Sequence, residues 1–365
     1  MRKFLLALAL SLASAFLVHV LRRPEGSLAR EFAGWWATLG EWGEKLLSMA
    51  RDVWRQVPGV VILCVVAMTL FFILRMGYFY RMRFHRLCRT GDSTVIRQEI
   101  ASGADVLRRS FSGWTTLMFA AESNPDPQVL TMLIRAGVPV HAESKNGQNA
   151  LLLAARGNPE PAIVRTLLSA GADPDGRSGS AGRTPLMVAA AFNPNPQVAK
   201  TLIDAGADIK ATGLALVMGC YWTAVMWAAA CNPNPEMIRL LLANGADLQE
   251  RDNAGATLLA IAARYSRSKA VITVLLDAGL NPELVDNSGE TALIRAVRGN
   301  PRVEVIKALL EGGADPHHAD RSGHTAIWYA GYADSREESP RRSRNRHHRP
   351  GKGGLVTLLQ QYGGK

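Results

Sequence analysis

The sequence predicts an all-α repeat solenoid: a stack of about eight helix-turn-helix units with hairpin loops, preceded by one or two transmembrane helices. Two apolar runs without Asp, Glu, Lys or Arg precede residue 80. An N-capping residue followed by a short apolar string recurs after them in seven copies. A glycine suited to end a helix recurs at steps of 34, 34, 35, 39, 34 and 34 residues. These glycines are Gly103, Gly137, Gly171, Gly206, Gly245, Gly279 and Gly313.

One unit, residues 184–208, shows how the residues specify two short helices. Thr184 is a good N-cap, and Pro185 follows at the first helical position, where its missing N–H costs nothing. Asn195 and Pro196 repeat this device for a second helix, which Gly206 ends. Neither helix is long enough to be stable alone, so the unit needs copies of itself to cover its apolar faces.

The copies carry a family resemblance. Their openings are WTTLMFAA from Trp114, QNALLLAA from Gln148, RTPLMVAA from Arg183, WTAVMWAA from Trp222, ATLLAIAA from Ala256, ETALIRAV from Glu290 and HTAIWYAG from His324. With the Gly-Ala-Asp ends, they resemble the ankyrin repeat over residues 83–362. The resemblance implies a rigid stack that binds partners on a concave, hairpin-lined side. The family's usual histidine is absent, and its positions hold Met118, Leu152, Met187, Met226, Ala260, Ile294 and Trp328.

The net charge of +11 is concentrated outside the repeats. Residues 1–30, 75–90 and 334–354 together carry +13, which leaves about −2 for the rest of the chain. A nearly neutral repeat body argues against nucleic acid as a partner. The four cysteines show no metal-ligand spacing and are expected to be small buried side chains in a reducing compartment.

Residues 1–23 are predicted to be a signal anchor or a signal peptide. The run 4–21 is apolar and about long enough to span a bilayer. Ala13-Ser14-Ala15 resembles a cleavage site, so both interpretations stay open. The run continues past Ala15 to Leu21, which favours the anchor.

Residues 24–56 form an amphipathic, tryptophan-rich segment with apolar residues at helical spacings. Because tryptophan prefers the headgroup level, this segment is expected to lie on a membrane surface. The alternative is a helix packed against its own protein.

Residues 57–80 are predicted to be a transmembrane helix. The run 57–74 has no charged residue, and five arginines follow within residues 75–90. The positive-inside rule puts that end in the cytoplasm. We therefore expect a membrane protein whose repeats are cytoplasmic, whether or not the first segment is cleaved.

No catalytic set, phosphate-binding loop or metal site emerges from the sequence, so we expect no enzyme and no cofactor. His317-His318 and His347-His348 are the only adjacent histidine pairs. The first pair falls where a hairpin begins and the second in a segment without apolar periodicity, which does not favour metal binding.

An arginine-rich insertion, residues 334–354, is expected to be disordered because it lacks apolar periodicity. It is a candidate site for anionic lipid or an acidic partner, and the alternative is a solvated insertion. The candidate residues are Arg341, Arg342, Arg344, Arg346 and Arg349.

The 39-residue step between Gly206 and Gly245 contains a hairpin of unusual composition, residues 212–222. Other copies are polar there, whereas this one is apolar, and exposed apolar patches tend to mark contact sites. The alternative is that the hairpin packs on its neighbours. The predicted partner-binding residues are Leu214, Leu216, Val217, Met218, Tyr221 and Trp222.

These patterns together predict a membrane-tethered ankyrin-repeat scaffold that binds a protein partner on the cytoplasmic side, without catalysis. The alternative is a regulatory or assembly subunit of a membrane pore or transporter. The apolar runs hold no ionisable residue beyond His19, which disfavours an ion path.

Overall fold

The computed structural model describes residues 84–363, except 178, 180, 216–218 and 337–353. The chain divides into two compact units, Met1–Gly77 and Tyr78–Lys365, and every described residue belongs to the second. The predicted segments 1–23, 24–56 and 57–80 lie outside the described residues. Within the described part of the chain, no helix has the length and apolar character needed to cross a bilayer.

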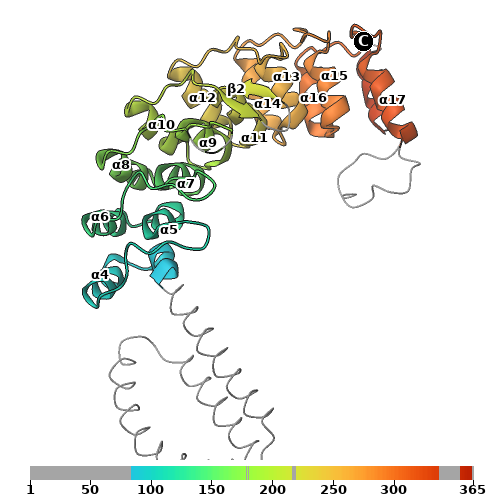
Figure 1. Ribbon diagram of the computed structural model, residues 1–365. Coiled ribbons are helices and arrows are strands. Elements are labelled where there is room, and N and C mark those ends of the chain that lie inside the picture. Colours follow the sequence, from blue (N-terminus) through green and yellow to red (C-terminus); the bar gives the residue numbers. More distant parts are fainter. Residues whose placement is uncertain (1–83, 178, 180, 216–218, 337–353, 364–365) are drawn as a thin grey trace, which may run out of the picture. The chain divides into compact units, whose positions relative to one another are not determined.

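The second unit is a stack of eight helix pairs among the described residues. Residues 84–90 are helical and pair with the first outer helix. Figure 1 shows α5, α7 and α9 on the inner side of a curved stack, with α6, α8 and α10 on the outer side. The inner helices are α5 (Thr116–Ser123), α7 (Ala150–Gly157), α9 (Pro185–Phe192), α11 (Ala224–Cys231), α13 (Leu258–Tyr265), α15 (Ala292–Gly299) and α17 (Ala326–Arg336). The outer helices are α4 (Ser93–Ala101), α6 (Pro127–Arg135), α8 (Pro161–Ser169), α10 (Pro196–Asp204), α12 (Pro235–Ala243), α14 (Lys269–Asp277), α16 (Val303–Glu311) and α18 (Gly354–Gly363).

Most inner helices begin with the side-chain cap that the sequence predicts, and α11 is an exception. Thr184 accepts a hydrogen bond from the backbone N–H of Met187, and Pro185 occupies the first helical position of α9. Asn195 caps α10 by accepting from the N–H of Gln197 at 3.0 Å. Thr223 makes no cap hydrogen bond within α11; its hydroxyl donates to Glu250 of the next hairpin at 2.5 Å.

The helix ends confirm the role of the repeated glycines. Each of the seven glycines that end an outer helix has a positive φ, between 88° and 100°. Only glycine adopts this backbone conformation without strain, so the 34-residue period is a period of left-handed turns.

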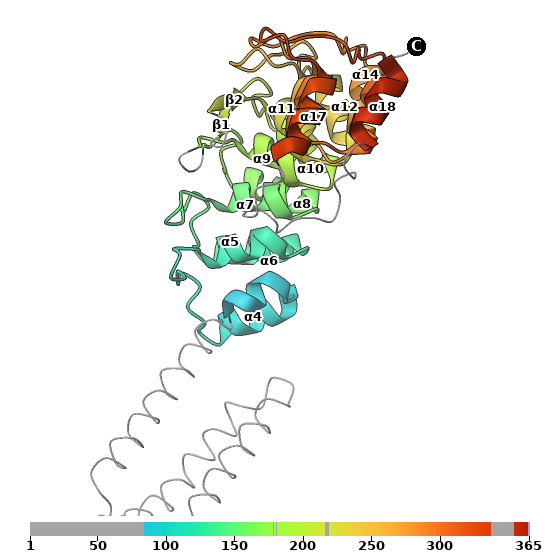
Figure 2. The same ribbon diagram turned by 90° about the vertical axis from the view of Figure 1, so that its right-hand side faces the viewer.

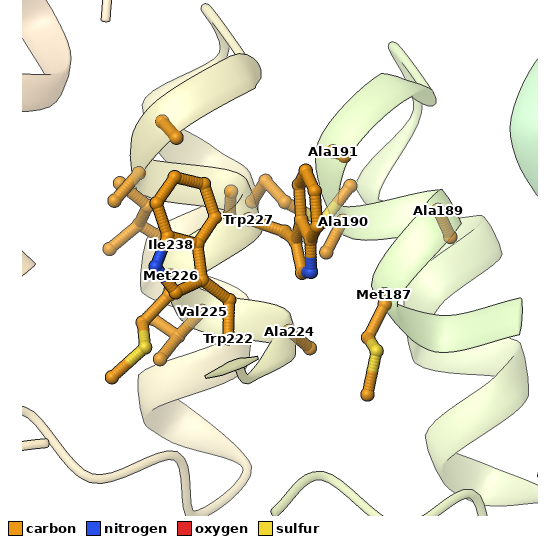
Figure 3. Packing of buried hydrophobic residues seen from close by; sticks show 14 of the residues in the cluster. Met187, Ala189, Ala190, Ala191, Trp222, Ala224, Val225, Met226, Trp227 and Ile238 are labelled. Carbon is orange, nitrogen blue, oxygen red and sulfur yellow. The ribbon is translucent and has the colours of Figure 1, made fainter. Parts of the chain in front are cut away.

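The core runs along the stack between the helix layers. α9 contributes Ala189 and Ala190, both fully buried, which let α11 approach closely. Figure 3 shows Trp227 of α11 beside the helix that carries Ala190 and Ala191. Small residues on one helix therefore make room for a large ring on the next, as close packing requires.

A ladder of buried asparagines, which no pattern within a single repeat predicts, links the repeats. Asn193 donates from its side-chain amide to the carbonyls of Ala155 and Asn158, both at 2.9 Å. Its side-chain oxygen accepts from the N–H of Asn195 at 2.9 Å. The other members, each donating to two carbonyls of the preceding repeat, are Asn124, Asn158, Asn232 and Asn300. The ladder satisfies backbone carbonyls that burial would otherwise leave unpaired.

The predicted insertion, residues 334–354, is helical at both of its ends. α17 runs on to residue 336, and α18 begins at Gly354. Residues between them, including the five candidate arginines, lie outside the described residues.

Candidate functional site

The apolar hairpin forms a small two-stranded sheet, β1 (Gly213–Ala215) and β2 (Cys220–Trp222). The strands are antiparallel, with Gly213 opposite Trp222 and Leu214 opposite Tyr221. Figure 2 shows both strands on the side of the stack from which the long inter-repeat loops project. The extra residues of the 39-residue step therefore build a hairpin, as the sequence predicts.

The alternation of the two strands separates the predicted contact residues. Tyr221 is 56% exposed and Leu214 is half-buried, whereas Trp222 is only 2% exposed. Successive side chains of a strand point to opposite faces, so one neighbour faces solvent while the other faces the stack. Leu216, Val217 and Met218 lie outside the described residues.

Trp222 packs into the stack, which matches the alternative that the hairpin folds onto its neighbours. Its ring lies 5.0 Å from the Trp227 ring in an edge-to-face arrangement, and 5.6 Å from the Tyr265 ring. Its indole N–H donates to Oδ2 of Asp252 at 3.4 Å. Trp222 is therefore an anchor of the hairpin, and the side chain that reaches solvent from β2 is Tyr221.

Neighbouring loops hold the hairpin on two sides. The N–H of Leu214 donates to the carbonyl of Ala181 at 2.9 Å. On the other side, the N–H of Tyr221 donates to the side-chain oxygen of Asn253 at 3.1 Å, and the Asn253 amide donates to the Gly219 carbonyl at 3.3 Å. The exposed Tyr221 ring thus extends from a backbone that is fixed to the preceding and the following repeat.

A basic and aromatic cluster adjoins the hairpin on the inner helices α7, α9 and α11 and on the loop residue that precedes the N-cap of α9. We call Arg156, Arg183, Phe192 and Trp227 the inner-face patch. The Arg183 guanidinium lies over the Trp227 ring, 4.2 Å from its centroid, and the Arg156 guanidinium lies 5.7 Å from the Phe192 centroid. Burial lowers the pKa of Arg183; Cys231 acts in the opposite direction, and the charge of Arg156 lowers the pKa further. No motif in the sequence marks this patch, because its four residues are scattered over residues 156–227, in three different repeats.

A second arginine cluster, near the end of the stack, is neutralised by acids. Arg295 of α15 pairs with Asp286 at 2.7 Å and lies 3.7 Å from Glu290. Arg298 also pairs with Glu290 and covers the Tyr329 ring at 4.9 Å. In this network each arginine has an acidic partner, and the ion pairs connect α15 to the preceding hairpin.

The repeats match two models of one protein family. A family model described as ankyrin repeats (3 copies) matches residues 84–178, 117–213 and 186–286, and a model for a single ankyrin repeat matches residues 288–321. The chain belongs to the ankyrin-repeat family. The ankyrin stack is also similar to the crystal structure of the human ASB11 ankyrin repeat domain, at a TM-score of 0.52 and 24% identity. That match covers 68% of this chain and 98% of the other, and it concerns the fold. No significant match was found among curated proteins.

Of the three described cysteines of this ankyrin-repeat protein, Cys88 and Cys220 are buried, as the sequence predicts, whereas Cys231 is exposed, which corrects the expectation for that residue. Burial raises the pKa of Cys88 to about 12 and raises the pKa of Cys220. Partial desolvation by neighbouring atoms also raises the pKa of Cys231, against the opposing effect of the Arg183 charge. A thiolate is the reactive form, so none of the three is activated as a nucleophile at neutral pH.

The histidine pair at the last hairpin has separate hydrogen-bond partners. His317 lies 2.9 Å from the carbonyl of Gly363, and His318 lies 3.3 Å from the carbonyl of Gly289. Among the described residues, no three His, Cys, Asp or Glu side chains gather as metal ligands would.

Proposed function

We propose that this ankyrin-repeat protein is a membrane-tethered scaffold that binds a protein partner on the cytoplasmic side and catalyses no reaction. The observation that carries the proposal is the exposed Tyr221 ring on a hairpin that both neighbouring repeats hold in place. An aromatic side chain supplies a large contact area with little loss of conformational freedom on binding. The N–H groups of Leu214 and Tyr221 already bond to the neighbouring repeats, so fixing the two strands costs little further entropy when a partner docks.

The membrane tether rests on the sequence. The apolar runs 4–21 and 57–74, and the arginines that follow the second run, favour an anchor with the repeats on the cytoplasmic side. A reporter fused after Lys365 tests this arrangement. Cytoplasmic activity supports it, and activity on the opposite side of the membrane contradicts it.

A crosslinking pull-down from native membranes tests the contact surface. We expect Tyr221→Ser, and the double substitution Leu216→Ser with Val217→Ser, to reduce partner recovery. Losing one buried side chain of this size costs about 1.5 to 3 kcal/mol, which weakens binding roughly tenfold or more. Val285→Ser is the matched control, because Val285 is an exposed apolar residue on a different hairpin.

Two results would count against the proposal. Unchanged recovery with both hairpin variants would exclude the hairpin as the contact surface. Currents through planar bilayers that contain only this chain would favour the alternative, a pore or transporter subunit.

A further inference from the structure

Two buried hydrogen-bond donors lie in the inner-face patch without an acceptor among the described residues. They are Nε of Arg183 and Nε1 of Trp227. Trp227 is 6% exposed, so its donor is held in a nearly dry position. The adjacent Trp222 shows the contrast, because its indole N–H reaches the carboxylate of Asp252. Buried donors are almost always paired in folded proteins, so two such donors in one place indicate where an acceptor binds.

The patch also lacks a carboxylate. The side chains whose charge acts on the pKa of Arg183 are Cys231 and Arg156. Desolvation raises the pKa of Cys231, so its thiol stays neutral and does not compensate the arginines. Within the described residues, neither Arg183 nor Arg156 forms an ion pair, in contrast to Arg298, which pairs with Glu290. Two positive charges on the inner face are thus left without a counter-charge from the residues that the structure describes.

The patch is continuous with the hairpin. A Cβ added to Gly213 of β1 would lie 3.4 Å from Cα of Arg183, so the strand packs directly on this arginine. Phe192, over which Arg156 lies, is 44% exposed. A bound segment can therefore meet positive charge and exposed aromatic surface together.

We propose that the inner-face patch binds an acidic segment of the partner protein, with one carboxylate paired to Arg183 and a neighbouring carboxylate paired to Arg156. This inference rests on the proposed function, since it names the chemistry of the same partner. The planar guanidinium of Arg183 suits bidentate pairing with a carboxylate. The exposed rings of Phe192 and Tyr221 receive apolar side chains that flank the acids. A nucleic acid would need a broad basic surface, and the repeat body carries almost no net charge.

A display selection on the full-length chain, purified in detergent micelles, tests the proposal. Random dodecapeptides are selected for binding, and the enriched peptides are expected to contain adjacent or alternating Asp and Glu with apolar flanks. The tightest peptide, labelled with fluorescein, is then titrated against variants by fluorescence anisotropy. Arg183→Gln and Arg156→Gln are each expected to weaken binding by about tenfold, since a charge-assisted hydrogen bond is lost.

Two further variants, together with Arg156→Gln, separate recognition from folding and from general electrostatics. Arg298 occupies the position in α15 that Arg156 occupies in α7, and it already pairs with Glu290. Arg298→Gln therefore removes the same charge outside the patch, and binding is expected to change less than twofold. Arg183→Lys keeps the charge and loses the planar fork, so its affinity is expected to lie between those of the wild type and Arg183→Gln. Arg156 is exposed, so Arg156→Gln reports on binding even where Arg183→Gln alters the packing on Trp227.

The outcomes distinguish this inference from the proposed function. Selected peptides that are not acidic, or acidic peptides that bind Arg156→Gln and Arg183→Gln as well as the wild type, would overturn the acidic-segment proposal and leave the scaffold function standing. A single-stranded oligonucleotide that displaces the peptide at equal concentration would also overturn it. A selection that enriches no peptide at all would contradict both.

Discussion

Asn193 donates a hydrogen bond from its side-chain amide to the backbone carbonyl of Asn158, one repeat earlier, over 2.9 Å. Asn158 in turn donates to the carbonyl of Asn124 at 2.8 Å. Each such asparagine side chain therefore forms hydrogen bonds within its own turn and to the preceding repeat. Neighbouring repeats are coupled by hydrogen bonds as well as by apolar packing. A stack in which each unit contacts only its neighbours depends on such links for its cooperativity.

The asparagine ladder gives the first prediction. Asn193→Ala is expected to lower the free energy of unfolding by about 2 to 4 kcal/mol, because two buried carbonyls and one N–H lose their partner. Urea denaturation followed by circular dichroism measures the change. Asn195→Ala is the matched control, since Asn195 only caps α10 and bonds a carbonyl near the surface, and its loss is expected to cost about 1 kcal/mol. Equal losses for the two variants would contradict the ladder's role.

The second prediction concerns the turn at Gly171, whose φ is 91°. A side chain added there meets nothing within 4 Å, so the cost of Gly171→Leu is backbone strain alone, about 1 to 2 kcal/mol. Because each repeat supports the next, hydrogen exchange is expected to accelerate in the repeats on both sides. Faster exchange confined to residues 160–175 would argue against a cooperative stack.

Two adjacent hairpin residues give the third prediction. Trp222→Ala is expected to destabilise the stack by about 3 to 5 kcal/mol, because it removes a buried ring that packs on Trp227 and Tyr265. Tyr221→Ala is expected to change stability by less than about 0.5 kcal/mol, since its ring is exposed. Thermal melts of the two variants test this division. A Tyr221→Ala protein that melts as early as Trp222→Ala would mean that the tyrosine is structural.

The fourth prediction is a pH dependence at the start of the stack. Burial lowers the pKa of His85 below its ordinary value of 6.5; the charge of Arg108 also lowers it, while the Arg108 carbonyl and Asp105 act in the opposite direction. At a pH between the lowered pKa of His85 in the folded chain and its ordinary pKa of 6.5, the unfolded chain binds more protons than the folded one. The stability that depends on a neutral His85 is therefore fully present above pH 6.5 and is lost as the pH falls through the lowered pKa. His85→Gln should flatten the stability profile in that range. His141→Gln, at an exposed position, should leave it unchanged.

The sequence by itself determined the helix pairs, their order and their ends. Thr184, Pro185 and Gly206 act through their own backbone and the first turn beside them, so local spacing was enough to predict them. The sequence also located the apolar hairpin, because its 39-residue step departs from the period.

Only the tertiary structure decided which residues face solvent and which act together. Trp222 and Tyr221 are both aromatic, and their opposite exposure follows from the strand register and from the neighbouring repeats that receive Trp222. Arg183 meets Trp227 because two repeats stack, and the amide of Asn193 finds carbonyls 35 and 38 residues away for the same reason. Such contacts depend on the distance between repeats in space, which no local pattern encodes, whereas caps and turns depend on bonds to residues a few positions along the chain.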